Sequence, residues 1–378
     1  MRVGSETGSV MDRRVVLHIG TMKTGTSFIQ SVLGSNKADL AEAGVVFPGG
    51  FGVQARAVRD MLKLPKQPRR NRRRWSQLAE QVHAGDATAI FSMEFLSFAG
   101  EEQVPRLVEP FDGLDVRVVL TVRDQFRVLP AQWQTYTRNF GTDGWEDYLR
   151  HVQPSRMGSG RNTRAFKTFH RAQDIETILS RWSSVPGVSS VEVVTVPPSG
   201  APREELWHRF CAAAGISGPD VSLDEVRDNE SLGYASCDYL RRANAHLQDV
   251  VPRRYRKGMR PLASRVLVPL RAEETRPQLD LKSATYARTR NAEIRDLLTR
   301  DGHRLHGSLE DLPVPRDLTD YSTPITTPPH EQVLRAARAV WDDAASRVGV
   351  AEGSRPEGLD DLVADGTRLL RQANAWDG

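Results

Sequence analysis

Short apolar runs alternate with longer amphipathic stretches along the first half of the chain. Four of these runs are rich in β-branched residues and predict buried strands, at Arg14–Ile19, Ala89–Ser92, Val116–Val122 and Val191–Val196. The stretches between them predict helices, at Thr26–Leu33, Gln103–Glu109, Phe126–Arg138, Ile175–Trp182 and Glu204–Ala214. Strands that alternate with helices predict an α/β fold, in which a parallel sheet has helices on both faces.

From residue 231 onward the pattern is helical. Helices are predicted at Tyr234–Leu247, Ser283–Asp301, Glu331–Val348 and Leu359–Asn374, whereas residues 251–282 are rich in Arg and Pro and give no assignment. No composition break separates this part from the sheet. We therefore expect a single domain over residues 13–378, preceded by a flexible tail over 1–12. Within it, an α/β core over 13–215 is followed by a mostly helical C-terminal part over 216–378.

The composition is that of a soluble globular protein, because 39% of the 378 residues are hydrophobic and 26% are charged. No apolar run reaches the roughly 18 residues that a membrane-spanning helix needs, and the first residues lack the apolar core of a secretory signal. Two cysteines, Cys211 and Cys237, are too few for a disulfide framework or a cysteine-based zinc site. These features predict a cytoplasmic location.

One segment accounts for the basic balance of the chain. Residues Lys63–Arg74 hold seven basic residues and no acid, and removing those seven from the net charge of +4 leaves −3. A nucleic-acid partner is therefore not expected, since nucleic-acid binders carry a basic face spread over a domain. The run is predicted to be a loop at the rim of the site. It is either a solvated loop or an electrostatic funnel for an anionic donor, an acidic acceptor or a lipid surface.

The most informative segment is HIGTMKTGTSFIQ, His18–Gln30, where a predicted strand enters a glycine-bounded turn and then a helix. Such a turn presents backbone N–H groups at the positive end of a helix, which is an anion-binding arrangement. Gly20 and Gly25 have the spacing of a Walker A loop, but Thr26 stands where that loop has its lysine, and Lys23 lies inside the turn. In the alternative reading, Thr26 or Ser27 only caps a helix and Lys23 is a solvated turn residue.

This segment resembles the 5′-phosphosulfate loop of sulfotransferases that use 3′-phosphoadenosine 5′-phosphosulfate (PAPS), in particular a bacterial branch with a KTGT core. The resemblance implies a P-loop-type α/β fold in which Lys23, Thr24, Gly25, Thr26 and Ser27 bind the 5′-phosphosulfate. Fixed N–H donors and one lysine can stabilise the charge of sulfuryl transfer without a divalent metal. No metal is expected.

Arg123 directly follows the third predicted strand, and ligands of open α/β sheets sit beyond the carboxyl ends of the strands. It resembles the 3′-phosphate motif of the same family, in which a serine follows eight residues after the arginine. Here that position is Ala131. Gln132 or Arg127 is a candidate for the missing contact, and a structural ion pair between Arg123 and Asp124 is the alternative reading.

Glu94 follows the second predicted strand and has apolar neighbours on both sides. Desolvation raises the pKa of a carboxyl in such a place, which suits a general base. The position resembles the Ser-x-Glu element of some sulfotransferases, where the glutamate deprotonates the acceptor hydroxyl. A helix cap or an ion pair remains an alternative role for Glu94. The rival bases are His18, which is typical of a core residue, and His170, which is typical of a surface residue.

Two weaker matches follow. DNESLG, Asp228–Gly233, resembles a landmark of the bacterial branch, but Asn229 or Ser231 capping the next helix explains it more simply. RYRKG, Arg254–Gly258, is similar to the Arg-Lys-Gly segment with which cytosolic sulfotransferases hold the 3′-phosphate, although the glycines that should follow are absent.

The resemblance implies a sulfotransferase that moves a sulfuryl group from PAPS to a hydroxyl or amine of a small-molecule, glycolipid or saccharide acceptor. One alternative is a P-loop kinase or nucleotide-binding protein, which needs an aspartate for magnesium, and Asp124 is a poor candidate for it. The second alternative is a binder of anionic surfaces or nucleic acid through Lys63–Arg74. The sequence sets neither the acceptor nor the oligomeric state.

Overall fold

The computed structural model describes residues 13–64, 73–154, 162–217, 221–224, 226, 231–374 and 376. The chain forms two compact units. Residues 1–122, 174–227 and 297–311 belong to the first, called here the sheet unit, and residues 123–173, 228–296 and 312–378 to the second, called here the helical unit. This interleaved division differs from the expected boundary near residue 215. The tail expected over residues 1–12 lies outside the described residues.

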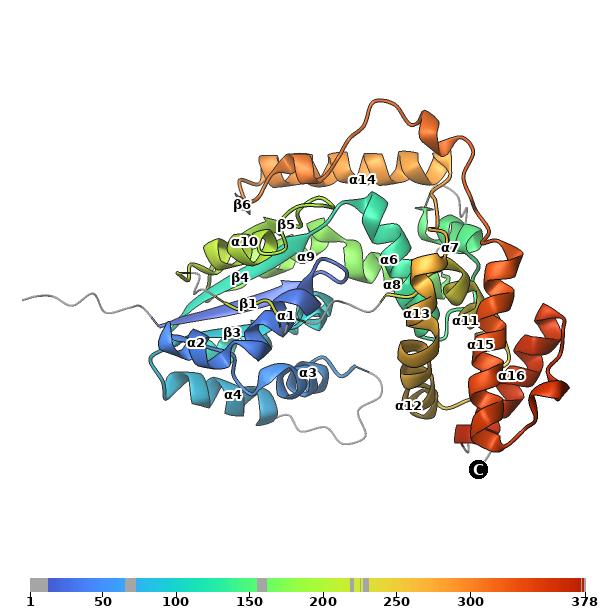
Figure 1. Ribbon diagram of the computed structural model, residues 1–378. Helices are drawn as coiled ribbons and strands as arrows, with labels where there is room; N and C mark the ends of the chain where they lie inside the picture. The colour runs from blue at the N-terminus through green and yellow to red at the C-terminus, as the bar shows by residue number, and fades with distance from the viewer. Residues whose placement is uncertain are drawn as a thin grey trace, which may run out of the picture. The chain divides into compact units, whose positions relative to one another are not determined.

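The sheet unit contains six parallel strands (Figure 1). They are β1 (Arg14–Gly20), β2 (Val45–Val46), β3 (Thr88–Ser92), β4 (Asp115–Val122), β5 (Val188–Thr195) and β6 (Arg304–His306), in the spatial order β2-β3-β1-β4-β5-β6. The four predicted strands and the parallel sheet are confirmed. The two edge strands were not predicted, because two or three residues are too short to show a period.

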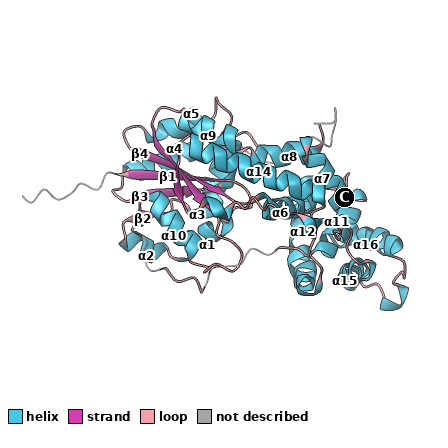
Figure 2. Ribbon diagram, turned by 90° about the horizontal axis from the view of Figure 1, so that it is seen from above, coloured by secondary structure: helices cyan, strands magenta, loops and turns pink. Residues whose placement is uncertain are grey.

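Helices cover both faces of this sheet (Figure 2). On one face, Val16, Ile90 and Val119 form a core with α1 (Thr26–Ser35) and α10 (Glu205–Ala214). On the other face, Phe91 packs against Trp75 of α4 (Arg73–His83), with 5.0 Å between their ring centroids. Neighbouring residues of a strand point to opposite faces, so Ile90 and Phe91 bury β3 from both sides. The α/β prediction with helices on both faces is therefore confirmed.

The sheet unit has four further α-helices in its described part, namely α2 (Lys37–Glu42), α3 (Gly50–Met61), α5 (Val104–Val108) and α9 (Ile175–Ser183). Two 3-10 helices also position the site and its surroundings, η1 (Glu94–Phe98) and η2 (Glu109–Phe111). No helix in the described ranges is both long and apolar enough to cross a membrane.

The second unit is built almost entirely from helices. They are α6 (Gln125–Arg138), α7 (Trp145–Val152), α8 (Arg164–Gln173), α11 (Tyr234–Ala245), α12 (Pro252–Leu262), α13 (Val268–Leu270), most of α14 (Leu281–Arg300), α15 (His330–Val348) and α16 (Leu359–Asn374). The Arg- and Pro-rich stretch without an assignment forms α12, a π-helical turn (Ala263–Leu267) and α13. The prediction of a mostly helical C-terminal part is confirmed.

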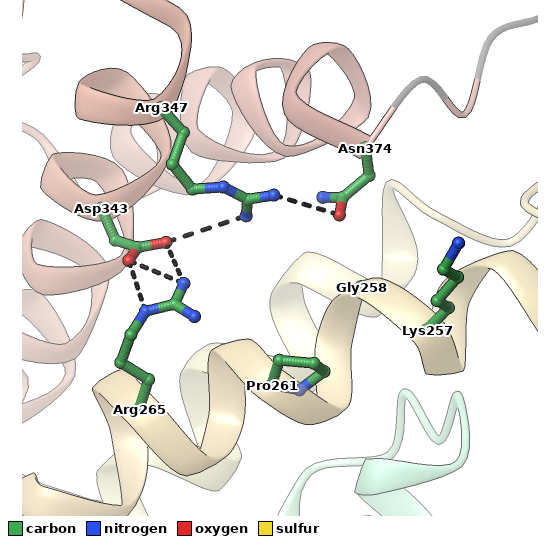
Figure 3. A pocket seen from close by; sticks show the side chains of 7 residues that line it. All are labelled: Lys257, Gly258, Pro261, Arg265, Asp343, Arg347 and Asn374. Atoms are coloured by element: carbon green, nitrogen blue, oxygen red, sulfur yellow. Dashed lines mark hydrogen bonds and ion pairs between the residues drawn. The ribbon is translucent and has the colours of Figure 1, made fainter.

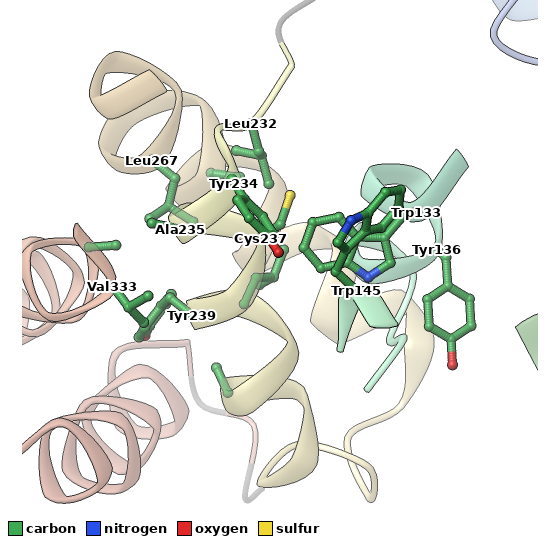
Figure 4. Packing of buried hydrophobic residues seen from close by; sticks show 14 of the residues in the cluster. Trp133, Tyr136, Trp145, Leu232, Tyr234, Ala235, Cys237, Tyr239, Leu267 and Val333 are labelled. Carbon is green, nitrogen blue, oxygen red and sulfur yellow. The ribbon is translucent and has the colours of Figure 1, made fainter. Parts of the chain in front are cut away.

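Aromatic side chains hold the core of the helical unit (Figure 4). The ring centroids of Trp133 and Trp145 are 5.4 Å apart, and Tyr234 meets Trp133 edge-on at 5.6 Å. All three side chains are buried, and such pairs add to the stabilisation that burial of their area provides. This core fastens α11 to α6 and α7.

Candidate functional site

A tightly curled loop joins β1 to α1 in the sheet unit. Three of its residues adopt left-handed backbone angles, with φ of 95° at Gly20, 67° at Lys23 and 85° at Gly25. The loop starts beside β4, where the N–H of Thr21 donates to the carbonyl of Thr121 at 3.0 Å. Gly25 is the N-cap residue of α1 and supplies no side-chain cap. A lysine at positive φ is unfavourable, and such backbone geometry gathers at ligand sites.

The two glycines are required by packing as well as by backbone angle. A Cβ at Gly20 would lie 3.0 Å from both Cα and Cβ of Glu94, and a Cβ at Gly25 would lie 2.4 Å from Cδ2 of Leu206. The first contact brings the backbone of Glu94 against the start of the loop. The second lets the start of α1 approach α10 closely.

The threonine hydroxyls of the loop point inward. Oγ1 of Thr24 donates to the carbonyl of Thr21 at 2.6 Å, and Oγ1 of Thr26 donates to the same carbonyl at 3.2 Å. Both threonines are buried, whereas Ser27 is exposed. In this structure Thr24 and Thr26 therefore use their hydroxyls to fix the loop. At these positions the backbone, rather than the side chain, is available to an anion at the positive end of α1.

Glu94 lies beside this loop, two residues beyond β3, as the first residue of η1. Its Oε2 accepts a hydrogen bond from Nε2 of Gln30 at 3.3 Å, and Gln30 also donates to the carbonyl of Ser92 at 2.9 Å. The helix-cap position is Met93, and no salt bridge to Glu94 occurs among the described residues. Neither alternative role expected for Glu94 is thus seen there. The carboxylate is half-buried and oriented by Gln30.

The two rival bases have different surroundings. His18 is fully buried in β1, and burial lowers the pKa of its imidazole to about 3, so it is a core residue as expected. His170 belongs to α8 of the helical unit and is half-buried rather than on the open surface. Its Nε2 donates to the carbonyl of Val152 at 2.9 Å, and its ring lies 4.1 Å from that of Phe166. A carbonyl only accepts, so the Nε2–H of His170 is already used.

Arg123 directly follows the last residue of β4 and belongs to the helical unit. Burial, and then the charge of Arg127, lower the pKa of the Arg123 guanidinium to about 10, so it stays protonated at neutral pH. Asp124 caps α6, because its Oδ1 accepts from the N–H of Arg127 at 3.0 Å and its Oδ2 pairs with the Arg127 side chain. Arg127 is therefore held by Asp124, and Ala131 offers no polar side chain.

The RYRKG segment lies on α12 and borders a pocket of about 270 Å³ within the helical unit (Figure 3). Lys257 and Gly258 line it together with Arg265, which pairs with both carboxylate oxygens of Asp343 at 2.9 and 2.8 Å. Arg347, four residues after Asp343 on α15, lies 3.9 Å from the same carboxylate. The pocket is mainly cationic.

The expected cap of α11 is corrected by the structure. Asn229 lies outside the described residues, and the N-cap residue is Gly233, four positions after Asn229 and two after Ser231, without a side-chain cap. Instead, Oε2 of Glu274 accepts from the N–H of Ser236 at 2.9 Å. A Cβ on Gly233 would lie 2.1 Å from this oxygen, so the glycine leaves space for a carboxylate that is far away in the sequence.

The basic run is described only at its ends, since residues 65–72 lie outside the described part. Lys63 follows α3 with φ of 51°, and Arg74 of α4 pairs with Asp60 of α3 at 2.5 Å. One charge of the run therefore joins two helices.

The sheet unit thus gathers the loop, Glu94 and Gln30 at the carboxyl ends of β1 and β3. Gln30 was not predicted as a site residue, although its place one turn into the helix after the loop is a usable signal. Among the described residues, no group of three or more His, Cys, Asp or Glu side chains is arranged to hold a metal ion.

No protein-family model matches the chain, and no curated protein matches it either. Among solved structures, the chain is similar to a crystal structure of a sulfotransferase from Alicyclobacillus acidocaldarius. The sequence identity is 17% and the TM-score 0.39, over 58% of this chain and 87% of that chain. A likeness of this size assigns neither a family nor an activity.

Proposed function

We propose that the protein is a sulfotransferase that moves a sulfuryl group from PAPS to a hydroxyl or amine of a small-molecule, glycolipid or saccharide acceptor. The observation that carries the proposal is the loop between β1 and α1, which holds Lys23 at positive φ and whose first glycine, Gly20, lies against Glu94. Loops of this shape offer fixed donors to an anion, and the carboxylate beside it offers a proton acceptor.

In the proposed reaction, Lys23 and the loop amides bind the 5′-phosphosulfate of the donor. Glu94, oriented by Gln30, accepts the proton of the acceptor hydroxyl while the acceptor oxygen attacks sulfur in line. The bond between sulfur and the phosphate oxygen breaks, and 3′,5′-bisphosphoadenosine leaves with the negative charge. Lys23 and the amides stabilise that charge, which is where preorganised donors accelerate transfer most.

Arg123 is proposed to bind the 3′-phosphate of the donor. Its position after β4 and its retained charge support this role. A kinase is less well supported, because both carboxylate oxygens of Asp124 are engaged by Arg127. Both cysteines are buried, and neither of these two described residues is in a disulfide, which supports the proposed cytoplasmic location. The proposed contact of Lys63–Arg74 with an anionic surface concerns residues that are mostly outside the described part.

The direct test incubates the purified chain with PAPS and an acceptor library, and detects both a mass gain of one sulfuryl group and release of 3′,5′-bisphosphoadenosine. We expect Lys23→Ala and Glu94→Gln to reduce turnover strongly, and Lys37→Ala, which changes an exposed lysine of α2, to leave it unchanged. EDTA should have little effect on sulfuryl transfer but should abolish phosphoryl transfer. Absence of bisphosphate binding in calorimetry would refute the sulfotransferase proposal.

A further inference from the structure

A buried histidine connects three neighbouring strands directly beneath the loop. His18 of β1 has no exposed surface, and its Nδ1 lies 2.8 Å from Oγ of Ser92 at the end of β3. Its Nε2 lies 3.3 Å from Oγ1 of Thr121 in β4. The ring of Phe210 packs against the imidazole, with 5.2 Å between the centroids. An apolar side chain could fill a buried space of this kind, so packing alone does not explain the two polar contacts of His18.

The hydrogen bonds fix the direction in which each proton is donated. Oγ1 of Thr24 lies 2.6 Å from the carbonyl of Thr21 and 2.6 Å from Oγ1 of Thr121. A carbonyl only accepts, so the single hydroxyl proton of Thr24 is donated to it. The hydroxyl of Thr121 must therefore donate to Thr24. Thr121 has no second proton, so the hydrogen bond between Thr121 and His18 needs a proton on Nε2 of the imidazole.

The other end of the chain of hydrogen bonds is equally determined. Burial keeps the imidazole neutral at physiological pH, with a pKa of about 3, so a proton on Nε2 leaves Nδ1 as an acceptor for the hydroxyl of Ser92. Ser92 is itself held on both sides. Its N–H donates to Oε1 of Gln54 at 3.0 Å, and its carbonyl accepts from Gln30 at 2.9 Å. One directed series therefore runs from β3 through β1 and β4 to the loop.

We propose that His18 is a positioning residue which, as the neutral tautomer protonated on Nε2, holds Thr121 and through it Thr24 in the loop conformation that binds the donor. The turn from Thr21 to Thr24 contains Lys23 at φ 67°, a conformation that a lysine does not favour by itself. The bond from Thr24 to Thr21 closes this turn, and the strands anchor it through Thr121. This inference rests on the proposed function.

The tautomer is tested by nitrogen NMR on protein labelled at histidine, with the His18 signals assigned by their loss in His18→Gln. We expect a protonated Nε2 and an unprotonated Nδ1 that persist through the range in which an ordinary histidine titrates. A proton on Nδ1, or a doubly protonated ring in that range, would overturn the directed series.

The positioning role is tested by the affinity for 3′,5′-bisphosphoadenosine in calorimetry. His18→Met removes both polar contacts at similar volume, whereas His18→Gln keeps an amide N–H for Thr121. We expect the methionine variant to bind about tenfold more weakly, as loss of a buried hydrogen bond allows, and the glutamine variant to recover most of the affinity. Unchanged affinity in His18→Met, with a lower unfolding temperature alone, would show a merely structural residue and overturn the proposal.

A double-mutant cycle separates the series from independent contacts. Because His18 acts through Thr121, the affinity of His18→Met/Thr121→Val should be no weaker than that of Thr121→Val alone. Additive losses would contradict the series. A wild-type protein that binds no bisphosphate overturns the proposed function together with the positioning role, whereas wild-type binding that His18→Met leaves unchanged overturns this inference only.

Discussion

The backbone conformation of Lys23 provides the most specific prediction, because the proposed function requires a lysine at a position where a glycine would be less strained. Its φ of 67° lies in the left-handed region, which costs a residue with a side chain about 1–2 kcal/mol and costs glycine almost nothing. Glycine also makes the unfolded chain more flexible, which lowers the stability of the folded protein by about 0.4–1 kcal/mol relative to alanine. The difference leaves Lys23→Gly more stable than Lys23→Ala by roughly 1 kcal/mol. Comparing these two variants cancels the loss of the lysine side chain.

The matched control is Lys167, an exposed residue within α8. There the order should reverse, with Lys167→Ala more stable than Lys167→Gly by about 1 kcal/mol. Urea-induced unfolding followed by circular dichroism measures all four variants. Both variants at Lys23 should also lose affinity for 3′,5′-bisphosphoadenosine, whereas both at Lys167 should keep it. Equal stability of the two Lys23 variants, or a more stable alanine, would refute the argument from backbone strain.

Three further outcomes are expected. Gly25→Ala should destabilise the protein by about 1–3 kcal/mol in urea unfolding, since a Cβ would lie 2.4 Å from Leu206 and φ is 85°. In a Leu206→Ala background the same substitution should cost less stability, and an equal cost in that background would contradict the steric cause. Gln30→Leu should lower kcat about tenfold with a smaller change in KM for the donor, because it releases the carboxylate of Glu94; an unchanged kcat would exclude an orienting role. The folded-state pKa of His18, about 3, lies below its ordinary value of 6.5, so as the pH drops below 6.5 the unfolded chain takes up the proton first and the stability falls. The urea midpoint should therefore fall less steeply with decreasing pH in His18→Gln than in the wild type. Parallel plots of midpoint against pH would contradict this.

Much of the sheet was predictable because its information is local. Each of the four long strands contains a short run of apolar, mostly β-branched residues, which is typical of a strand buried on both faces. The loop was predictable for the same reason, since Gly20, Lys23 and Gly25 lie within six consecutive residues. The edge strands β2 and β6 were missed because pairing with a neighbour, rather than their own pattern, makes them strands.

The partners of the site residues were not predictable from the sequence. Capping of α11 illustrates the difference, because Glu274 stands 38 residues after the Ser236 N–H that it accepts from. A local rule placed the cap on Asn229 or Ser231, and only the packing of the helical unit brings the carboxylate to Ser236. The inward direction of the Thr24 and Thr26 hydroxyls is likewise a property of the closed turn.

The sequence by itself determined that a buried strand enters a glycine-bounded turn with Lys23 inside it, and that Glu94 follows a second buried strand. The tertiary structure decided that these two pieces meet. The strand order β3-β1-β4 places Ser92, His18 and Thr121 side by side, although Ser92 and Thr121 are 74 and 103 residues from His18 along the chain. Short-range periodicity dictates which segments are strands, but contacts between side chains depend on which strands become neighbours, and that choice is made by the packing of the whole sheet.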